Sequence, residues 1–426
     1  MAPPSPAAGK TAHVFSGYEK FVIAILAFLQ FTIVLDFMIL SPLGAILLPA
    51  LRITTSQFGA VVSAYAVAAA ISGLLAAGFA DRFDRKRMLL FFYVGFILGT
   101  ALCGFAPNYH VLFIARTITG LFGGVIGAVS FAIVADLFPL QVRGRVMGFV
   151  TSAFAASQVL GLPLGIYFAA KLGWHSPFIM IASIAGLVGI IILFRLKPID
   201  AHLTSPTKRN PLQHLLKTAT SRRYITGFSA TMLLATGGFM LMPFGAAFSV
   251  NNLGIPLDEL PMIYAVTGCT SLILGPLIGR ISDRVGKYRT FCVATLVGTV
   301  VVIGYTRLGV TPIWAVILIS IVLFASISGR MVAAGALASA VPAPEDRGAY
   351  MSISASLQQF AGALSSMVAG WIVVQNPATG RLNHYPLLGV VVGSIMLLTI
   401  LLMYNVHQLV SEQLPTSFAP TPAAEV

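Results

Sequence analysis

The chain has 426 residues, of which 57% are hydrophobic and only 9% are charged, and its mean hydropathy is +0.91. Soluble globular domains carry about 25% charged residues, so this composition excludes a soluble protein and indicates a helical protein with many membrane spans. A formal charge of +13 is typical of nucleic-acid binders, but Lys and Arg also accumulate in the cytoplasmic loops of membrane proteins. Their distribution along the chain favours the second explanation.

The apolar segments predict twelve transmembrane helices, each of about 20 residues or more. Residues 1–20 and 407–426 are expected to be disordered tails, and residues 196–223 a cytoplasmic linker between an N-terminal bundle, 21–195, and a C-terminal bundle, 224–406. The predicted helices lie at 21–49, 57–79, 88–106, 109–137, 144–169, 175–195, 224–250, 259–280, 289–307, 312–340, 347–374 and 384–406.

Positively charged residues assign the two sides of the membrane. Of the 26 Lys and Arg, four fall on one side of the predicted helices, two lie inside helices (Arg116 and Arg330), and the remaining twenty fall on the other side. Because cytoplasmic loops are enriched in Lys and Arg, both termini are predicted to be cytoplasmic. The four outer residues are Arg52, Lys171, Arg307 and Arg381.

A short basic motif follows both the second and the eighth predicted helix. Residues 77–87 read AGFADRFDRKR, and residues 279–289 read GRISDRVGKYR. An Arg-Gly pair before helix five, residues 143–144, also recurs before helix eleven, at residues 347–348. Two parallel six-helix halves are the internal symmetry of one large class of transporters.

With these motifs the chain resembles the major facilitator superfamily over residues 21–406, and within it the arabinose-efflux-permease-like, drug:proton antiporter branch. The second motif copy fits the family signature Gly-x-x-x-Asp-Arg-x-Gly-Arg/Lys-x-Arg/Lys, whereas the first has Asp84 in place of the inner glycine. Because Asp tolerates left-handed backbone, the turn is expected to survive. Helix four fits its own signature at Arg116, whereas helix five reads Gly-Leu-Pro-Leu-Gly where the antiporter signature has adjacent Gly-Pro.

The resemblance implies an all-α membrane protein in which twelve transmembrane helices form two pseudo-symmetric six-helix bundles, with both termini in the cytoplasm. It further implies a multi-pass protein of the bacterial inner membrane that is monomeric and works by alternating access. Its expected partners are the lipid bilayer, a small-molecule substrate and protons, with no nucleic acid, no cofactor and no metal.

Asp36 and Arg116 lie inside predicted helices, where a charge is expensive. Asp36 is fifteen residues into the first helix, close to the middle of the bilayer, and Arg116 lies about 12 Å below the outer surface at 1.5 Å per residue. A carboxylate whose proton affinity depends on conformation can couple transport to protons, and we expect this role for Asp36, tuned by Arg116. The alternatives are a permanent structural pair and, for Arg116, a brace on backbone carbonyls.

Charged residues at the cytoplasmic ends are expected to form a conformational lock. Arg85 is predicted to pair with Asp136, and Asp81 to meet the positive N-terminus of helix eleven. The resemblance implies that such contacts close the cytoplasmic side and break when the protein turns inward; the alternative is that these charges only set topology. The full predicted set is Asp81, Arg82, Arg85, Asp136, Asp283 and Arg284.

Polar and aromatic residues within the helices are candidates for lining a substrate cavity. Each of them is explained by packing as well, and Arg330 also by snorkelling to the headgroups. Aromatic and methionine side chains give an adaptable apolar surface, which favours an amphiphilic substrate. The candidates are Tyr65, Gln158, Phe239, Met242, Phe244, Arg330 and Gln358.

The sequence therefore predicts a secondary active transporter, expected to export small amphiphilic, drug-like or sugar-like compounds in exchange for protons. An uncoupled facilitator or importer of a small organic solute is one alternative, and a membrane receptor that keeps the fold without turnover is another. An enzyme is not expected, because the sequence lacks a nucleophile–base pair, a phosphate-binding glycine loop and a His/Cys metal cluster.

Overall fold

The computed structural model describes residues 15–79, 83–200, 203, 211–343 and 346–411. These residues are almost all helical, and the sheet among them is a two-stranded antiparallel hairpin, β1–β2. The elements are α1 Gly17–Ile39, α2 Gly44–Leu51, α3 Thr55–Phe79, α4 Arg85–Gly104, α5 Tyr109–Leu137, α6 Leu140–Ala156, η2 Ser157–Gly161, α7 Leu162–Leu172, α8 Ser176–Arg195, α9 Pro211–Ala219, α10 Arg222–Leu241, η4 Met242–Phe244, α11 Gly245–Asn251, α12 Leu260–Val285, α13 Lys287–Tyr305, α14 Ile313–Ala340, α15 Arg347–Ile372, β1 Val374–Gln375, β2 Leu382–Asn383 and α16 Tyr385–Ser411.

The twelve-helix architecture is confirmed. Eleven segments of the described chain are long and apolar enough to cross a membrane, and α15, with 26 residues, completes the twelve. Helix α15 is more polar than the others because it carries five serines and the pair Gln358 and Gln359. It packs along α3 of the other half, so its polar residues need not face lipid.

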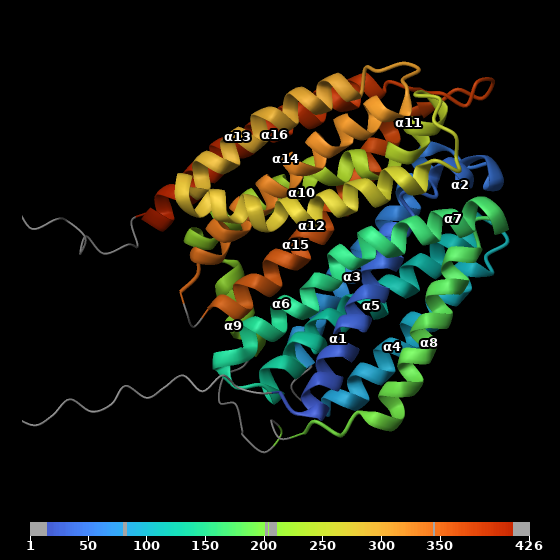
Figure 1. The fold of residues 1–426 in the computed structure, drawn as a ribbon. Coiled ribbons are helices and arrows are strands. Elements are labelled where there is room, and N and C mark those ends of the chain that lie inside the picture. The colour runs from blue at the N-terminus through green and yellow to red at the C-terminus, as the bar shows by residue number, and fades with distance from the viewer. Residues whose placement is uncertain (1–14, 80–82, 201–202, 204–210, 344–345, 412–426) are drawn as a thin grey trace, which may run out of the picture.

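The two halves of the chain form two bundles that meet along α3 and α15. Figure 1 shows the N-terminal half in blue to green and the C-terminal half in yellow to red, with the short helix α9 at one end of the molecule. Helix α9 lies in the predicted linker and contacts both α3 and α15. The linker therefore touches both halves at their cytoplasmic ends.

Prolines interrupt the first span of each half at matching places. The first predicted span is two helices, α1 and α2, that are separated by a turn containing Pro42. The seventh is α10 and α11, with a short 3-10 turn around Pro243 between them. Proline lacks the N–H that an α-helix needs, and the two interruptions face each other, since Ser41 Oγ donates a hydrogen bond to the carbonyl oxygen of Met242.

A π-helical turn, η2, interrupts the fifth span just before Pro163. The N–H of Leu162 bonds to the carbonyl of Ser157, five residues back. A proline in a helix clashes with the carbonyl four residues earlier, and a wider turn relieves that clash. Beyond the turn, α7 contacts α12 of the other half, whereas α6 packs mainly on α1.

Both ends of the helical region extend further than the sequence predicted. Helix α1 begins at Gly17 instead of residue 21, because Ser16 and Glu19 form a capping box in which each side chain accepts a hydrogen bond from the other residue's backbone N–H. Helix α16 continues to Ser411, so residues 407–411 are helical and not part of a disordered tail. The rest of both predicted tails lies outside the described residues.

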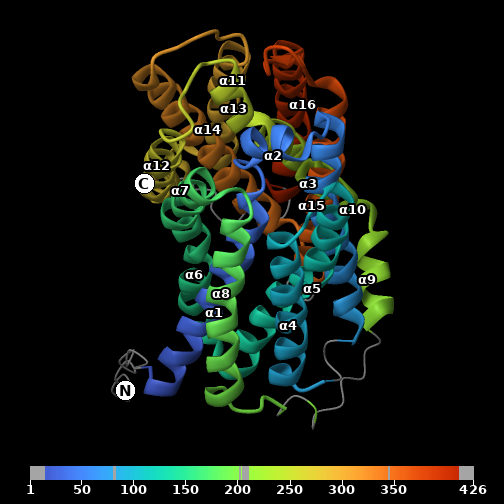
Figure 2. The same ribbon diagram turned by 90° about the vertical axis from the view of Figure 1, so that its right-hand side faces the viewer.

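The apolar core shows that the two halves are joined at the outer end. One cluster of buried side chains includes residues from both halves there, among them Leu43, Phe58, Phe244 and Phe248. Toward the cytoplasm each half has a separate cluster of its own. Figure 2 shows α2, α7 and α11 gathered at the outer end, so the structure is a conformation closed to the outside.

Hydrogen bonds and close backbone contacts seal this outer end. Thr55 Oγ1 donates to the carbonyl of Val373 at 2.5 Å, and Ser63 Oγ donates to the carbonyl of Ala363 at 2.6 Å. A Cβ on Gly59 would lie 2.7 Å from the carbonyl oxygen of Ser366, so only glycine permits this approach of α3 to α15.

Candidate functional site

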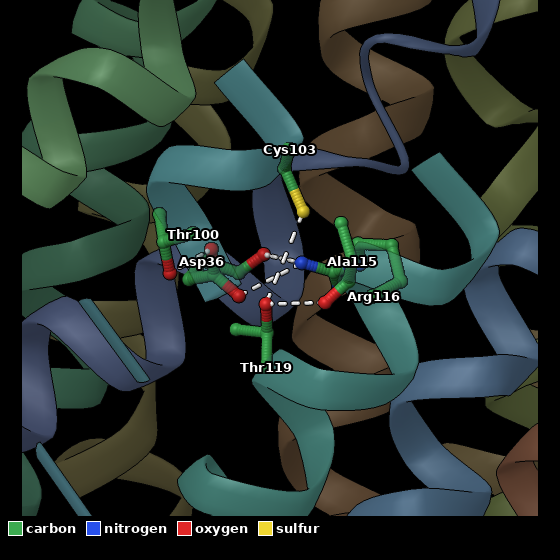
Figure 3. A network of polar contacts seen from close by, with 6 residues as sticks. All are labelled: Asp36, Thr100, Cys103, Ala115, Arg116 and Thr119. Atoms are coloured by element: carbon green, nitrogen blue, oxygen red, sulfur yellow. Dashed lines mark hydrogen bonds and ion pairs between the residues drawn. The ribbon is translucent and has the colours of Figure 1, made fainter. Parts of the chain in front are cut away.

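A buried ion pair joins α1 and α5 in the N-terminal half. Arg116 Nη1 lies 2.8 Å from Asp36 Oδ2 and 3.2 Å from the backbone carbonyl oxygen of Asp36. The side chains of both residues are at most 1% exposed. Figure 3 shows the pair together with the hydroxyls of Thr100 and Thr119. Two opposite charges buried among apolar helices are less costly as a pair than either charge is alone, because each neutralises the other.

Both oxygens of the Asp36 carboxylate accept hydrogen bonds, because Thr100 Oγ1 on α4 donates to Oδ1 at 3.1 Å. The guanidinium is less completely satisfied, since Arg116 Nε makes no hydrogen bond within the described part of the protein. The carboxylate is thus held from α4 and α5, whereas the arginine keeps a donor that another acceptor can use. Thr100 was not singled out in the sequence, although a lone Thr in the apolar run ILGTAL is a signal that could have identified it.

The depth of Arg116 is close to the sequence prediction. Arg116 is seven residues from the first residue of α5, which is about 10 Å at 1.5 Å per residue. Asp36 contacts Arg116 directly, and α1 ends at Ile39, three residues after Asp36. The position of Asp36 close to the middle of the bilayer stays a prediction.

A row of aromatic rings links the ion pair to the C-terminal half. The guanidinium carbon of Arg116 lies 4.5 Å from the centroid of the Tyr65 ring. The ring of Phe37 lies 5.4 Å from that of Tyr65 and 5.8 Å from that of Phe239, which belongs to α10. Two predicted cavity residues, Tyr65 and Phe239, are therefore connected to the pair through Phe37, a residue that the sequence analysis did not include.

The other predicted cavity residues are spread over the interface between the halves. Gln158 lies in η2, where its backbone touches Gly268 of α12, and Gln358 is half-buried on α15. Met242 is half-buried, and its carbonyl accepts the bond from Ser41. Phe244 is completely buried against Phe58, which makes it a packing residue in this conformation.

Arg330 lies apart from these residues, inside the C-terminal half. It is 4% exposed, and its guanidinium carbon is 5.9 Å from the centroid of the Phe291 ring. A snorkelling arginine keeps its head in water or among headgroups, so this burial contradicts the snorkelling explanation.

At the cytoplasmic side Arg85 Nε lies 2.9 Å from Asp136 Oδ2, the pairing predicted from the sequence. Arg85 belongs to α4 and Asp136 to α5, so the pair lies within one half and does not bridge the two. It is formed in a conformation closed to the outside. The expectation that this pair breaks when the protein turns inward stays a prediction.

The two copies of the basic motif have different structures. Gly286, before α13, has φ of +106°, whereas Asp84, before α4, has φ of −54°, so the expectation of left-handed backbone at Asp84 is wrong. Instead, the Asp84 carboxylate accepts from the N–H of Arg87 at 2.8 Å and from that of Ile199 at 2.7 Å. Asp84 caps α4 and ties it to the start of the linker.

The remaining lock residues are exposed or fall outside the described ranges. Asp283 pairs with Lys287 at 2.9 Å within its own loop, and its side chain is 70% exposed. Arg284 is exposed as well. The predicted residues Asp81 and Arg82 lie outside the described residues.

A polar cluster that the sequence analysis missed lies where the linker meets α15. Tyr224 Oη donates to Asp346 Oδ2 at 2.7 Å, and His214 Nε2 of α9 lies 3.6 Å from Asp346 Oδ1. Asp346 immediately precedes α15. An acid directly before the Arg-Gly pair of helix eleven is the sequence signal that could have identified this contact.

Two six-helix halves that share an apolar core at one end and have separate cores at the other are the architecture of a membrane transporter. The family model described as Major Facilitator Superfamily matches residues 26–366 and 227–424. The chain belongs to the Major Facilitator Superfamily, and it is not an enzyme.

Individual proteins agree with this assignment. The chain is 29% identical over 265 residues to the Uncharacterized MFS-type transporter YceJ of Bacillus subtilis (strain 168), a match that covers 61% of this chain and 66% of that protein. It is 35% identical over 131 residues to Multidrug resistance protein 3 of the same organism, covering 31% of this chain and 26% of that protein. A crystal structure of a D-xylose-proton symporter superposes with a TM-score of 0.72 at 15% identity, covering 92% of this chain and 98% of that one, which shows the fold alone.

Proposed function

We propose that this transporter exports small amphiphilic, drug-like or sugar-like compounds in exchange for protons by alternating access. The observation that carries the proposal is the Asp36–Arg116 pair, with a 2.8 Å contact and almost no exposure. A carboxylate in apolar surroundings changes its proton affinity strongly when a cationic partner moves away. Proton binding at Asp36 then depends on the conformation of the N-terminal half, which is the requirement for coupling.

The row of aromatic rings supports a connection between this pair and a substrate between the halves. Phe37 follows Asp36 directly in the chain, and its ring contacts Tyr65 on one side and Phe239 of the C-terminal half on the other. An amphiphilic solute that binds between Phe37 and Phe239 displaces the ring next to the ion pair. Substrate binding and proton binding then influence each other through one short contact path.

The names of similar proteins support export and proton coupling separately, because no single name combines the two. One relative is named for multidrug resistance, and one structure of the same fold is a proton symporter. Proton-coupled export therefore remains our proposal, with an uncoupled facilitator or importer as the second candidate. The second candidate is favoured by the hydrogen bonds to both oxygens of Asp36, which are also expected of a permanent structural pair.

Proteoliposomes with an imposed pH gradient test the proposal. The wild-type protein is expected to show proton flux when a transported amphiphilic dye is added, and Asp36→Asn is expected to abolish that proton flux while dye binding remains. Asp258→Asn, the same change at an exposed carboxylate before α12, is the matched control and retains flux. Unchanged gradient-driven accumulation in Asp36→Asn would refute proton coupling at this residue, and binding without any flux in the wild type would indicate a receptor.

A further inference from the structure

Arg330 is a buried cation in which two of the three guanidinium nitrogens make no hydrogen bond among the described residues. It lies on α14 and is 4% exposed, and the two nitrogens are Nε and Nη2. Arg116, the other arginine inside a span, has Asp36 as its partner. A guanidinium in the membrane interior that lacks an acceptor is costly, so such residues commonly face a ligand or a partner.

Two hydroxyls of this half donate to backbone carbonyls, and neither accepts a hydrogen bond from Nε or Nη2 of Arg330. Ser326, one turn earlier on α14, donates to the carbonyl of Ala294 at 2.5 Å. Thr295 on α13 donates to the carbonyl of Phe291 at 2.7 Å. Within the described part of the chain, these side chains do not supply the acceptors that Arg330 lacks.

No carboxylate in the described part of the C-terminal half is placed to pair with Arg330. Asp258 and Glu259 precede α12 at the outer end. Asp283 and Asp346 lie at the cytoplasmic ends of their helices, where they contact Lys287 and Tyr224, respectively. Within the described residues of this half, the positive charge of Arg330 therefore has no carboxylate as a partner.

Helix α10 passes the guanidinium at a glycine. Arg330 Nη2 lies 3.9 Å from the position where Gly237 of α10 would carry a Cβ, and side-chain atoms of Met396 and Ile395 of α16 lie 3.4 and 3.9 Å from the same position. The next residue, Gly238, is exposed, and a Cβ there would meet no atom within 4 Å. These two glycines lie about one turn before the interruption at Met242.

We propose that Arg330 binds the anionic group of the transported solute, and that the substrates include small amphiphilic monoanions, above all carboxylates. Nε and Nη2 form one edge of the guanidinium and donate in parallel, and a planar carboxylate accepts both bonds at once. These are the two nitrogens of Arg330 that have no hydrogen-bond partner in the described ranges of the chain. The statement that the anion is transported rests on the proposed function. The statement that Arg330 binds an anion does not depend on that function.

Thermal unfolding of the purified full-length protein in detergent tests this site with a matched pair of probes, benzoate and benzamide. The two share a planar aromatic body and differ in charge. We expect benzoate to raise the unfolding midpoint at a concentration at least tenfold lower than benzamide, since a ligand that binds the folded state stabilises it. Arg330→Gln is expected to remove this difference, whereas Arg307→Gln, which changes an exposed arginine after α13, keeps it.

Two further arms make the result decisive. Arg330→Lys retains the charge without the parallel donors, so it is expected to bind benzoate more weakly than the wild type. It replaces Arg330→Gln in the comparison if Arg330→Gln does not fold. Choline chloride added to a low-salt buffer tests whether a free inorganic anion binds at this site. If chloride raises the unfolding midpoint as much as benzoate does, and benzoate causes no further rise in its presence, the assignment to an organic solute is overturned. Equal shifts by benzoate in the wild type and Arg330→Gln would overturn the site itself.

The test is independent of proton coupling. Asp36→Asn is expected to lose proton flux and to keep the benzoate shift, because Asp36 and Arg330 lie in different halves. If the wild-type protein shows proton flux but no preference for benzoate over benzamide, the anion site alone is rejected. Absent proton flux with an intact benzoate preference would reject the proposed coupling alone.

Discussion

Ser366 on α15 donates a hydrogen bond from its Oγ to the carbonyl oxygen of Phe239 on α10, at 3.2 Å. Phe239 is the residue four positions before Pro243, which has no N–H to offer that carbonyl. The hydroxyl also lies 3.0 Å from the carbonyl of Gly362 in its own helix. A neighbouring helix thus satisfies the backbone group that the proline leaves open, as membrane interiors require.

Removing this donor is expected to destabilise the C-terminal half. Ser366→Ala removes the side-chain donor to the Phe239 carbonyl and is expected to lower the free energy of unfolding by about 1 kcal/mol, the usual size of an interhelical hydrogen bond in a membrane. Titration with sodium dodecyl sulfate measures the loss. Ser394→Ala is the control, because Ser394 is exposed and bonds only to Val390 of its own helix. Equal effects of the two changes would contradict this role of Ser366.

The Arg85–Asp136 pair is expected to contribute to the stability of the N-terminal half. Asp136→Asn leaves Arg85, whose side chain is 5% exposed, without its carboxylate and is expected to cost about 1–2 kcal/mol, less than for a fully buried pair because Asp136 is 21% exposed. The double change Arg85→Gln/Asp136→Asn is expected to cost less than the two single losses added together. Strict additivity in detergent unfolding would show that the two side chains do not interact.

A larger residue at the tight contact between α3 and α15 is expected to open the outer end. Gly59→Leu forces a side chain against the Ser366 carbonyl, where even a Cβ would lie only 2.7 Å away. In a variant with its native cysteines replaced by alanine, a cysteine at Val373 reports on opening through labelling by a membrane-impermeant maleimide. We expect Gly59→Leu to raise the labelling rate several-fold.

The control for this labelling is Gly186→Leu on α8, where a Cβ would meet no atom within 4 Å. This change is expected to leave the rate unchanged. A rate that stays the same in Gly59→Leu as well would mean that the contact between α3 and α15 does not hold the outer end closed.

The two copies of the basic motif are expected to respond differently to alanine. Gly286→Ala forces a side chain into φ of +106° and is expected to cost about 1–2 kcal/mol. Asp84→Ala removes a helix cap and the bond to Ile199, at about 1 kcal/mol or more. Gly348→Ala, at a glycine with negative φ and open space, is the control in the same unfolding titration.

Replacing Asp84 by glycine, the residue found at the matching position 286, tests whether position 84 needs a flexible backbone or a helix cap. Asp84→Gly is expected to destabilise, because glycine at a backbone φ of −54° supplies neither hydrogen bond. If Asp84→Gly were neutral or stabilising, the departure from the family signature at this position would have no structural role.

The sequence predicted the number, order and orientation of the helices because these depend on apolar length and on the sides that Lys and Arg occupy. It also predicted the contact of Asp36 with Arg116, since a membrane interior leaves a buried charge few alternatives to a partner. Thr100 and Phe37 could not be assigned in the same way, because a single threonine or phenylalanine in an apolar helix has many possible neighbours. Their roles depend on how α1, α3 and α4 are rotated, which apolar periodicity does not determine inside a bundle.

The failure at Asp84 has a different cause. The signature position was interpreted as a turn in both copies, and Asp is compatible with such a turn. The structure uses the carboxylate instead, because Ile199 from the start of the linker provides an N–H within 2.7 Å. A contact made by a residue more than a hundred positions away is not visible in a local motif.

Among the described residues, three hydrogen bonds join the two halves, and all three run in the same direction. The donors are hydroxyls of the N-terminal half, and the acceptors are backbone carbonyls of the C-terminal half at Met242, Ala363 and Val373. A carbonyl survives any substitution of its own residue, whereas a hydroxyl is lost with most substitutions. These three bonds therefore depend on the side chains of Ser41, Thr55 and Ser63 in the N-terminal half, whereas in the C-terminal half it is packing that limits substitution at the buried acceptor residues Ala363 and Val373.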